Sequence, residues 1–474
     1  MSTTTPPTDG APPLTIWLTD RSRYRLGTGR CPMARYLGYH WGPTGYGITL
    51  RAEALPLATG LYVHYGVEAF CGVLKSRDTL PSLEETRLII AEVRKAYTAR
   101  VEDRGFRGIL GGPQTEETIV EQSILISGLL WALRLKFLPW LHQTYRVLSV
   151  ETERVHMLTC SCGAGALDFW EHVRRECNGK GLMLRTDILG LRRGGTTCAY
   201  FECKTTGWAG DAWAEQWEGD PQLGLGTLDV PQLHGAEVTE LYVVGLDKGK
   251  RVRDRGDVEG RRKQQSALCY GYFRPGNPPL AADEWLPAYE WVNDAGEVKR
   301  APRTHKREGI WKLAESDWPT WQAYHHQDPT LTPEEFWVRT LPASVMDKIC
   351  FLLGPMDRQD DQIHSLRGSI VGEEDRWQQT LWRLYEAQQT MAWSSPEFQA
   401  LLDELIPRSW NCRPFGKEAQ CEFYQICHRH EGWQDPLAGA YQPRLPHHDP
   451  ELRQAIARGL LPDQAAASEW ETDA

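Results

Sequence analysis

The sequence predicts an α/β fold, because helical patterns in its first third are followed by a series of strand patterns. Residues 82–104 carry apolar side chains at helical spacing behind a Ser-Leu-Glu-Glu start. Residues 116–146 continue the helical pattern, with Pro139 as an expected break. Three segments rich in β-branched and aromatic residues then follow: 145–155, 182–191 and 196–205. We therefore expect a helical lobe followed by a meander of strands.

Turn residues and apolar runs predict the later elements. A Gly-Gly pair at 194–195 marks the turn between the last two strands of the meander. Residues 239–245 are an apolar run expected to form a further buried strand, and the polar stretch 213–235 before it has room for a helix. A basic segment, Trp-rich strands and then helices follow, so we expect a large α+β insertion at 250–405.

These patterns divide the chain into six segments. We expect a disordered N-terminus (1–14), a helical lobe with its leading segment (15–145) and the sheet core (146–249). The insertion (250–405), a cysteine-containing segment (406–435) and a partly disordered tail (436–474) follow.

Composition limits the class of protein. With 474 residues, 41% apolar side chains and 20 Trp, the chain can bury a substantial core. The most apolar stretch, Ile124 to Trp140, contains two cationic residues and a proline, so we expect a core helix and no membrane partner. No secretory signal is visible, and 12 sparse cysteines favour reduced thiols, so we expect a cytoplasmic protein. The net charge of −10 restricts any DNA contact to a local patch.

Two acidic residues are the chemical centre of the core. Asp187 and Glu202 are expected on adjacent strands joined by the glycine turn, so their carboxylates can converge. Carboxylates, carbonyls and waters are the ligands that Mg²⁺ and Mn²⁺ favour. Lys204 lies two residues beyond Glu202, on the same face of the strand, where its ammonium can act on a phosphate or a water. The plain alternative is an exposed pair of Glu202 and Lys204, with Asp187 in a turn.

Asp187 and the run Glu202-Cys203-Lys204 resemble the motif of the PD-(D/E)XK nuclease superfamily, in particular its RecB-like branch. The resemblance implies a restriction-endonuclease-like core with a mixed central sheet flanked by helices. It also implies that Asp187, Glu202 and Lys204 are catalytic, and that Asp187, Glu202 and the Cys203 carbonyl hold Mg²⁺ or Mn²⁺. It covers about residues 25–245 and 405–430.

Three accessory residues follow the same resemblance. Gly60 and His64 resemble a Gly-x-x-x-His element on an early helix, which makes His64 a metal ligand. Val150-Glu151 resembles the pair that opens the first core strand, so Glu151 is a supporting residue. Gln222 stands where the branch places a glutamine that contacts DNA or the lysine, although Gly226 replaces the expected tyrosine after it. Each residue has a plain alternative. His64 can be a packing residue, Glu151 can form a surface pair with Arg154, and Gln222 can lie on a helix surface.

The cysteines near the chain ends resemble those of the iron–sulfur subset of RecB-like nucleases, which includes AddB-type recombination subunits and CRISPR-associated RecB-like exonucleases. In that layout one cysteine lies near the N-terminus and three lie beyond the core: Cys31, then Cys412, Cys421 and Cys427. Four thiolates are the complement of a [4Fe–4S] cluster, which here would clip the two chain ends together. The spacing of Cys412 and Cys421 is wider than in the subset, which leaves zinc open.

A second cysteine group competes as a metal site. Cys160, Cys162 and Cys177 lie between the first two core strands, and a fourth ligand requires His156 or His172 to join them. We expect reduced, non-ligating thiols at these positions.

The resulting prediction is a metal-dependent DNA nuclease, expected to be an exonuclease acting on single-stranded ends in recombination or DNA processing. Eight Lys and Arg residues within 248–263 are a candidate DNA contact or a solvated loop, and Trp208, Trp213 and Trp217 are expected in the core rather than stacked on bases. The chain has no P-loop, so a helicase or other recombination or CRISPR partner would supply any motor. The alternatives are a non-catalytic DNA-binding or assembly subunit and a zinc-stabilised structural protein.

Overall fold

The computed structural model describes residues 16–248 and 323–461, each with short gaps, and four short strands between 285 and 305. The longer gaps within these ranges are 108–115, 163–168 and 410–420. The expected disordered ends, Trp208 and all of the basic run except Lys248 lie outside the described residues.

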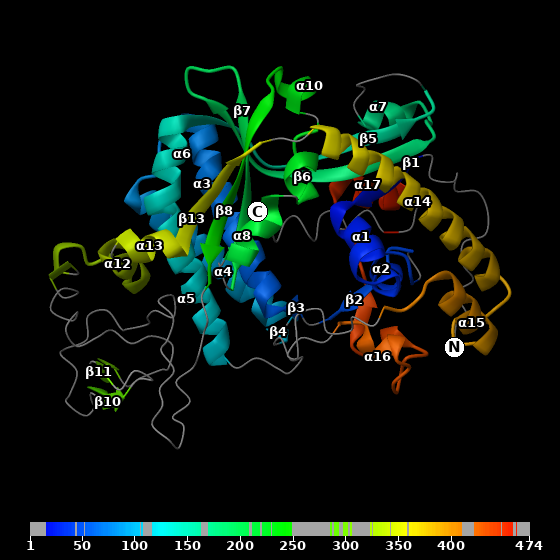
Figure 1. Cartoon of the computed structure of the whole chain (residues 1–474). Helices are drawn as coiled ribbons and strands as arrows, with labels where there is room; N and C mark the ends of the chain where they lie inside the picture. The colour runs from blue at the N-terminus through cyan, green and yellow to red at the C-terminus, as the bar shows by residue number, and fades with distance from the viewer. Residues whose placement is uncertain are drawn as a thin grey trace.

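A mixed central sheet organises the molecule, which confirms the predicted α/β class (Figure 1). The strand order is β1-β6-β7-β8-β13, and β5 pairs with the other edge of β6. The pairs β5–β6, β6–β7 and β8–β13 are antiparallel, whereas β1–β6 and β7–β8 are parallel. The strands are β1 (Ile16–Asp20), β5 (Tyr145–Cys160), β6 (Gly179–Arg192), β7 (Cys198–Thr206), β8 (Val238–Asp247) and β13 (Cys350–Met356). The predicted meander and buried strand are therefore present, with β5, β6 and β8 longer than expected.

The predicted turn between β6 and β7 is present, and Gly194 adopts φ +73°, which a glycine reaches without a steric cost. β6 shares one of its edges between two strands. Its first residues pair with β1, up to Met183, and its last residues pair with β7, from Ile188 onwards. β7 continues beyond this contact as far as Thr206, paired only with β8. The sheet therefore forks where β7 leaves β6.

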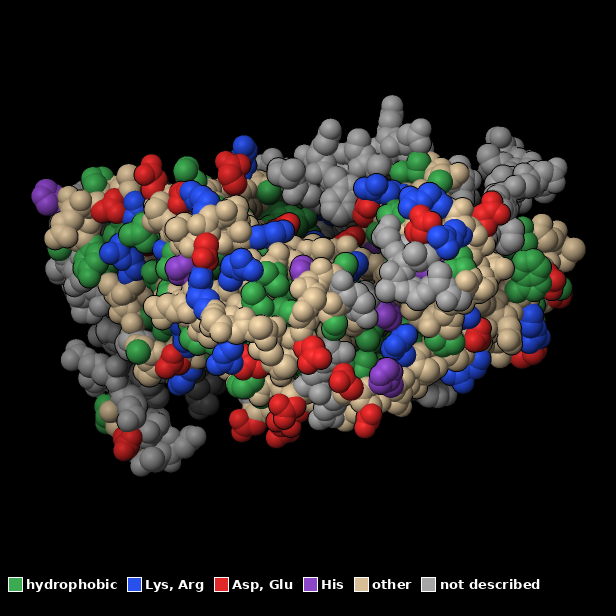
Figure 2. All heavy atoms as spheres, turned by 90° about the horizontal axis from the view of Figure 1, so that it is seen from above, with side chains coloured by type: hydrophobic (Ala, Val, Ile, Leu, Met, Phe, Trp, Pro, Cys, Tyr) green, Lys and Arg blue, Asp and Glu red, His purple; other side chains and the backbone are tan. Residues whose placement is uncertain are grey.

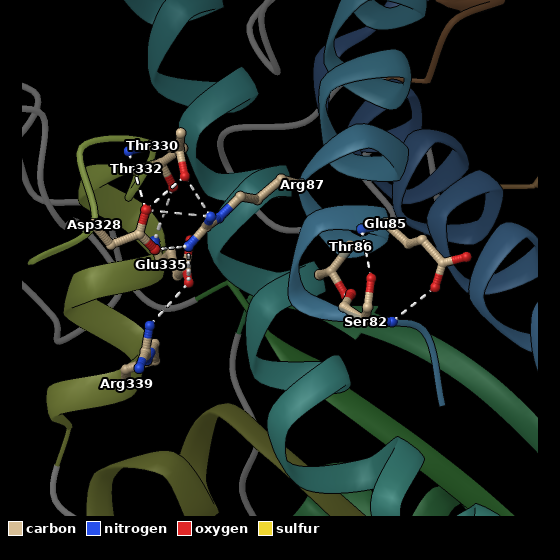
Figure 3. A network of polar contacts seen from close by, with 9 residues as sticks. All are labelled: Ser82, Glu85, Thr86, Arg87, Asp328, Thr330, Thr332, Glu335 and Arg339. Carbon is tan, nitrogen blue, oxygen red and sulfur yellow. Dashed lines mark hydrogen bonds and ion pairs between the residues drawn. The ribbon is translucent and has the colours of Figure 1, made fainter. Parts of the chain in front are cut away.

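Four helices cover one face of the sheet, where their apolar side chains join residues of β5 to β8 in the largest core cluster. They are α3 (Leu55–Arg77), α4 (Leu83–Arg104), α5 (Glu116–Ala132) and α6 (Leu138–Thr144). Ser82 and Glu85 exchange backbone and side-chain hydrogen bonds at the start of α4, as the sequence predicts (Figure 3). The break expected at Pro139 takes the form of a π-helical turn over Leu133–Phe137, directly before α6.

Short helices cover the other face. In the stretch where the sequence left room for one helix, the structure has α8 (Asp211–Glu218), α9 (Pro221–Leu225) and α10 (Val230–His234). Their buried residues pack against β7 and β8, and Trp217 is 6% exposed within this cluster. Trp213 packs against Trp217 with ring centroids 5.7 Å apart, so both tryptophans belong to the core as expected.

The two ends of the chain pack together beside the long helix α14 (Asp360–Gln388) (Figure 1). The fully buried Arg35 guanidinium lies 2.6 Å from the carboxylate of Glu374, and Arg23 lies 2.5 Å from Glu451. The elements involved are α1 (Arg21–Arg25), a π-helical turn (Leu26–Arg30), α2 (Pro32–Tyr39), β2 (Ile48–Leu50), α15 (Pro396–Leu405), α16 (Tyr424–Cys427), a 3₁₀ turn (Pro436–Ala438), β14 (Tyr441–Pro443) and α17 (Asp449–Ala457).

Part of the expected insertion belongs to the central sheet. β13 lies inside 250–405, yet its apolar residues Cys350 to Leu353 pair with Leu246 to Val243 of β8 at the sheet edge. The preceding α12 (Pro333–Thr340) and α13 (Ala343–Ile349) pack on the helical lobe. Arg87 of α4 binds Asp328 at 2.5 Å and Glu335 at 2.7 Å, which ties this segment to the lobe (Figure 3). The remaining elements are α7 (Phe169–Arg174), β3 (Glu53–Ala54) with β4 (Phe106–Arg107), β9 (Trp285–Leu286) with β12 (Thr304–His305), and β10 (Tyr289–Val292) with β11 (Val298–Ala301).

Two helical stretches, Leu57–Arg77 and Gln122–Thr144, are long and apolar enough to cross a membrane. Within them, 50% and 72% of the most apolar window is buried inside the molecule, which is the behaviour of core helices. The second stretch contains the segment that the sequence assigns to the core.

Candidate metal and catalytic site

The three motif residues lie at the fork in the sheet. Asp187 occupies β6 directly before the first residue that pairs with β7, and Glu202 follows the last residue of β7 that pairs with β6. Lys204 lies two residues further along β7. The divergence of the strands therefore leaves space between the two carboxylates where backbone pairing would otherwise continue.

A side chain replaces the missing backbone pairing. The carboxylate oxygen Oδ2 of Asp187 accepts a hydrogen bond from the backbone N–H of Cys203 at 2.7 Å. The Asp187 side chain is only 8% exposed, and this burial raises the pKa of its carboxyl group. Asp187 is thus a buried strand residue and not the turn residue of the plain alternative.

Glu202 is fully buried between two donors on its own strand. The Tyr200 hydroxyl donates to one carboxylate oxygen, and the Lys204 ammonium contacts the other. Burial raises the pKa of the Glu202 carboxyl group, and the nearby Asp187 raises it further. Burial lowers the pKa of Lys204, but the Glu202 carboxylate outweighs it and the net pKa is raised. Lys204 keeps 28% of its side chain exposed, so it links a buried carboxylate to the surface.

Helix α3 brings His64 to the same place. Nδ1 of His64 lies 2.9 Å from Oε1 of Glu151 and 3.9 Å from Oδ2 of Asp187. Gly60, one turn earlier, faces β7 closely, since a Cβ at this position would lie 3.3 Å from the Thr205 hydroxyl. Burial lowers the pKa of His64, but the Asp187 and Glu151 carboxylates produce a net rise.

Glu151 takes a more central position than its supporting role implied. The register pairs Val150 with Ile188 and Thr152 with Thr186, so Glu151 lies across from Asp187. It has φ +42°, a conformation that non-glycine residues rarely adopt and that often accompanies function. One ligand atom from each of His64, Glu151 and Asp187 lies within 4.8 Å of the others. These three donors can hold a divalent cation, with Glu202 beside them.

Two residues of the site did not enter the sequence prediction. Arg185 Nε lies 2.7 Å from Oε2 of Glu151, and Tyr200 donates to Glu202. Each lies two residues before a motif carboxylate, on the same strand face, so the period of two in a strand was the available signal. The Cys203 side chain, by contrast, packs in the helix-covered core behind the site. Gln222 lies in α9, and its side chain is outside the described part of the chain.

Three of the four end cysteines lie in one region. Cys31, at the start of α2, and Cys421 and Cys427, around α16, all pack against the same hydrophobic cluster. The Phe423 ring comes within 3.2 Å of the position of a Cβ on Gly38, which shows how closely the two ends meet. Cys412 lies outside the described residues.

The second cysteine group consists of free thiols, as predicted, and the structure brings them close enough to form a possible metal-binding group. Sγ of Cys160 lies 2.8 Å from Sγ of Cys162 and 3.1 Å from Nδ1 of His172. With Cys177 they form a set of four donors within 4.8 Å of one another. His172, one of the two histidines that the sequence offered as a fourth ligand, joins the group because α7 folds back on the hairpin. Burial and the two neighbouring thiols raise the pKa of Cys177 to about 12.

The surface charge is mixed. On the face shown in Figure 2, Lys and Arg side chains are interspersed with Asp and Glu among the described residues. No protein-family model and no curated protein sequence matches the chain.

Proposed function

We propose that the chain is a Mg²⁺- or Mn²⁺-dependent deoxyribonuclease of the RecB-like PD-(D/E)XK type. The main support is the convergence of Asp187 and Glu202 at the fork between β6 and β7, with Lys204 against Glu202 and His64 against Asp187. The sequence motif requires these types of residue on consecutive strands, and the structure has them there. A chance surface motif would not be buried at one point of the sheet.

The donor set suits a hard divalent cation. His64, Glu151 and Asp187 would hold it, with Glu202 and the Cys203 carbonyl as the further ligands that the family resemblance implies. Buried carboxylates whose pKa values are raised are stabilised by a cation, because it supplies the missing positive charge. When bound, such a cation polarises a phosphodiester and lowers the pKa of a bound water.

The surrounding residues have separate roles in this proposal. Lys204 orients the attacking water or neutralises charge that develops on the phosphate, because its ammonium lies at the carboxylate of Glu202 and part of its side chain reaches the surface. Arg185 fixes the Glu151 carboxylate, and Tyr200 fixes that of Glu202. We propose single-stranded DNA or DNA ends as substrate, cleaved exonucleolytically in the cytoplasm, with a helicase or other recombination or CRISPR partner.

A structural [4Fe–4S] cluster at Cys31, Cys412, Cys421 and Cys427 is the second part of the proposal. It is supported by the packing of the three described cysteines on one hydrophobic cluster where the chain ends meet. Anaerobically purified protein should contain iron and sulfide and absorb visible light. Cys421→Ser should lose this absorbance, whereas Cys198→Ser, at a buried thiol of β7, should keep it. Absence of iron from the wild type would contradict the cluster.

The activity is tested with end-labelled single-stranded and duplex DNA and Mn²⁺ under anaerobic conditions. The wild type should degrade DNA, and Glu202→Ala should not. Glu240→Gln is a matched control, because Glu240 lies on β8 and binds Tyr145 and Arg192. DNA retention without cleavage would favour the non-catalytic subunit, and neither retention nor cleavage would favour a structural protein.

A further inference from the structure

The hairpin of β5 and β6 carries a second set of metal donors at the end where β5 stops and β6 begins. Cys160 is the last residue of β5, Cys162 lies in the following turn, His172 is in α7, and Cys177 precedes β6. From these four residues we infer a structural zinc site. The inference does not depend on the proposed nuclease activity.

The geometry of the donors suits a single metal ion. The three sulfur atoms and Nδ1 of His172 all lie within 4.8 Å of one another. Zinc bonds of about 2.0–2.3 Å in a tetrahedron place the donors roughly 3.5–4 Å apart. Sγ of Cys160 and Sγ of Cys162, 2.8 Å apart, would move slightly apart around the ion. Three cysteines and one histidine form a closed set without a position for substrate, which is typical of structural zinc. A [4Fe–4S] cluster is usually held by four cysteines, so zinc is the better match.

The local backbone is shaped to bring these donors together. The backbone N–H of Cys162 lies 3.3 Å from Sγ of Cys160, a contact that stabilises a thiolate. Glu176, directly before Cys177, has φ +50°, which turns the chain sharply toward β6. The Cys177 N–H then donates to the carbonyl oxygen of His172 at 3.1 Å, which joins the last two ligands.

The histidine itself is the second observation that favours a metal. The His172 ring is fully buried, with Nδ1 directed at the sulfurs, and its Nε2 has no hydrogen-bond partner among the residues that the structure describes. A neutral imidazole nitrogen that faces cysteine sulfurs inside the molecule is placed as a zinc ligand. A disulfide between Cys160 and Cys162 would leave His172 and Cys177 without a common partner.

Zinc at this point would join the end of β5, α7 and the start of β6. α7 packs its residues Phe169 and Val173 against Leu18 of β1 and Met183 of β6. The metal would therefore fix the outer end of the hairpin whose inner part carries Glu151 and Asp187. The role of the zinc ion is structural, because protein donors take all four of its coordination positions.

The test measures zinc and iron by mass spectrometry in the full-length protein grown with both metals. The wild type should hold about one zinc per chain. Cys162→Ser changes an exposed residue, so its fold should survive while its zinc content falls by about tenfold and its iron content stays unchanged. The matched control, Cys198→Ser, should retain its zinc.

Cobalt provides a readout that needs no variant. Metal-depleted wild-type protein given Co²⁺ should develop the thiolate-to-cobalt absorption of a tetrahedral site, and one equivalent of Zn²⁺ should remove it. Either of two results would overturn the inference: zinc content unchanged in Cys162→Ser, or wild-type protein that contains no zinc and binds neither metal. Detection of a Cys160–Cys162 disulfide in protein handled without oxygen would also overturn it.

Discussion

Nδ1 of His64 lies 2.9 Å from Oε1 of Glu151, so a helix on one face of the sheet meets the strand opposite Asp187. Neither residue is near the other in the sequence, and neither belongs to the Asp187, Glu202 and Lys204 motif. The contact gives Glu151 a direct place among the metal donors, whereas the sequence had indicated only a supporting role.

Glu151→Gln is expected to weaken Mn²⁺ binding about 10- to 100-fold, because it removes the charge of one donor while keeping its size. Glu240→Gln, on β8, should bind Mn²⁺ like the wild type, because Glu240 binds Tyr145 and Arg192. Titration calorimetry of the three proteins checks the prediction. Equal affinities for the wild type and Glu151→Gln would place the cation elsewhere.

Asp187→Asn is expected to stabilise the metal-free protein at pH 7 by roughly 1 kcal/mol. Burial raises the folded-state pKa of Asp187, so the folded protein holds this proton more tightly than the unfolded chain. Stability is therefore lost as pH rises from the ordinary aspartate pKa through the raised folded value, and at neutral pH the charged carboxylate opposes folding. Asparagine removes that charge and keeps an oxygen for the Cys203 N–H.

Thermal unfolding with and without Mn²⁺ checks this prediction. Mn²⁺ should raise the unfolding temperature of the wild type and leave that of Asp187→Asn nearly unchanged. A variant that is less stable than the wild type in chelator would indicate that Asp187 is a structural residue.

Arg87→Ala is expected to destabilise the docking of α12 on the helical lobe by about 1–3 kcal/mol. The variant removes the guanidinium that Asp328 and Glu335 share (Figure 3). Glu335 is fully buried and would lose its cationic partner at 2.7 Å. Arg94→Ala should cost less, because the Arg94 side chain is 34% exposed against 19% for Arg87 and lies 3.4 Å from Glu334. Hydrogen exchange over 328–340 should speed up in Arg87→Ala alone.

The effect of Arg87→Ala should also depend on pH. The Thr330 hydroxyl and Arg87 lower the pKa of Asp328 to about 2. The contribution of ionised Asp328 to folding stability is therefore fully present above about pH 4, the ordinary pKa of aspartate, and is lost as pH falls toward 2. Asp328 is 37% exposed, so this part of the effect is small. Urea unfolding at pH 6 and pH 3 should show a smaller difference between wild type and variant at the lower pH.

The sequence predicted the local parts of the fold well, because strand and helix patterns are written in neighbouring residues. The start of α4 at Ser82 and the turn at Gly194 are examples. It did not predict that β13 would return to the sheet edge or that β1 would pair with β6, since both depend on contacts between residues far apart in the chain.

The same distinction applies to the sites. Asp187, Glu202 and Lys204 follow from a motif on consecutive strands, and the structure brings them together at the fork. Glu151 and His172 gain their positions from tertiary packing, through a positive φ in β5 and through the fold of α7 onto the hairpin. The sequence named Glu151 as a supporting residue and His172 as one of two possible fourth ligands, but only tertiary packing shows that they join the two donor sets.

The most direct test of the central claim is Mn²⁺-dependent degradation of end-labelled DNA by wild type and Lys204→Ala. Lys180→Ala is the matched control, because it removes a lysine of β6 that is paired with Asp375. We expect Lys204→Ala to lower the cleavage rate by about 10²–10⁴-fold with its fold and iron content unchanged, and Lys180→Ala to cleave normally. Cleavage at the wild-type rate by Lys204→Ala would contradict the assignment of this site as a nuclease centre.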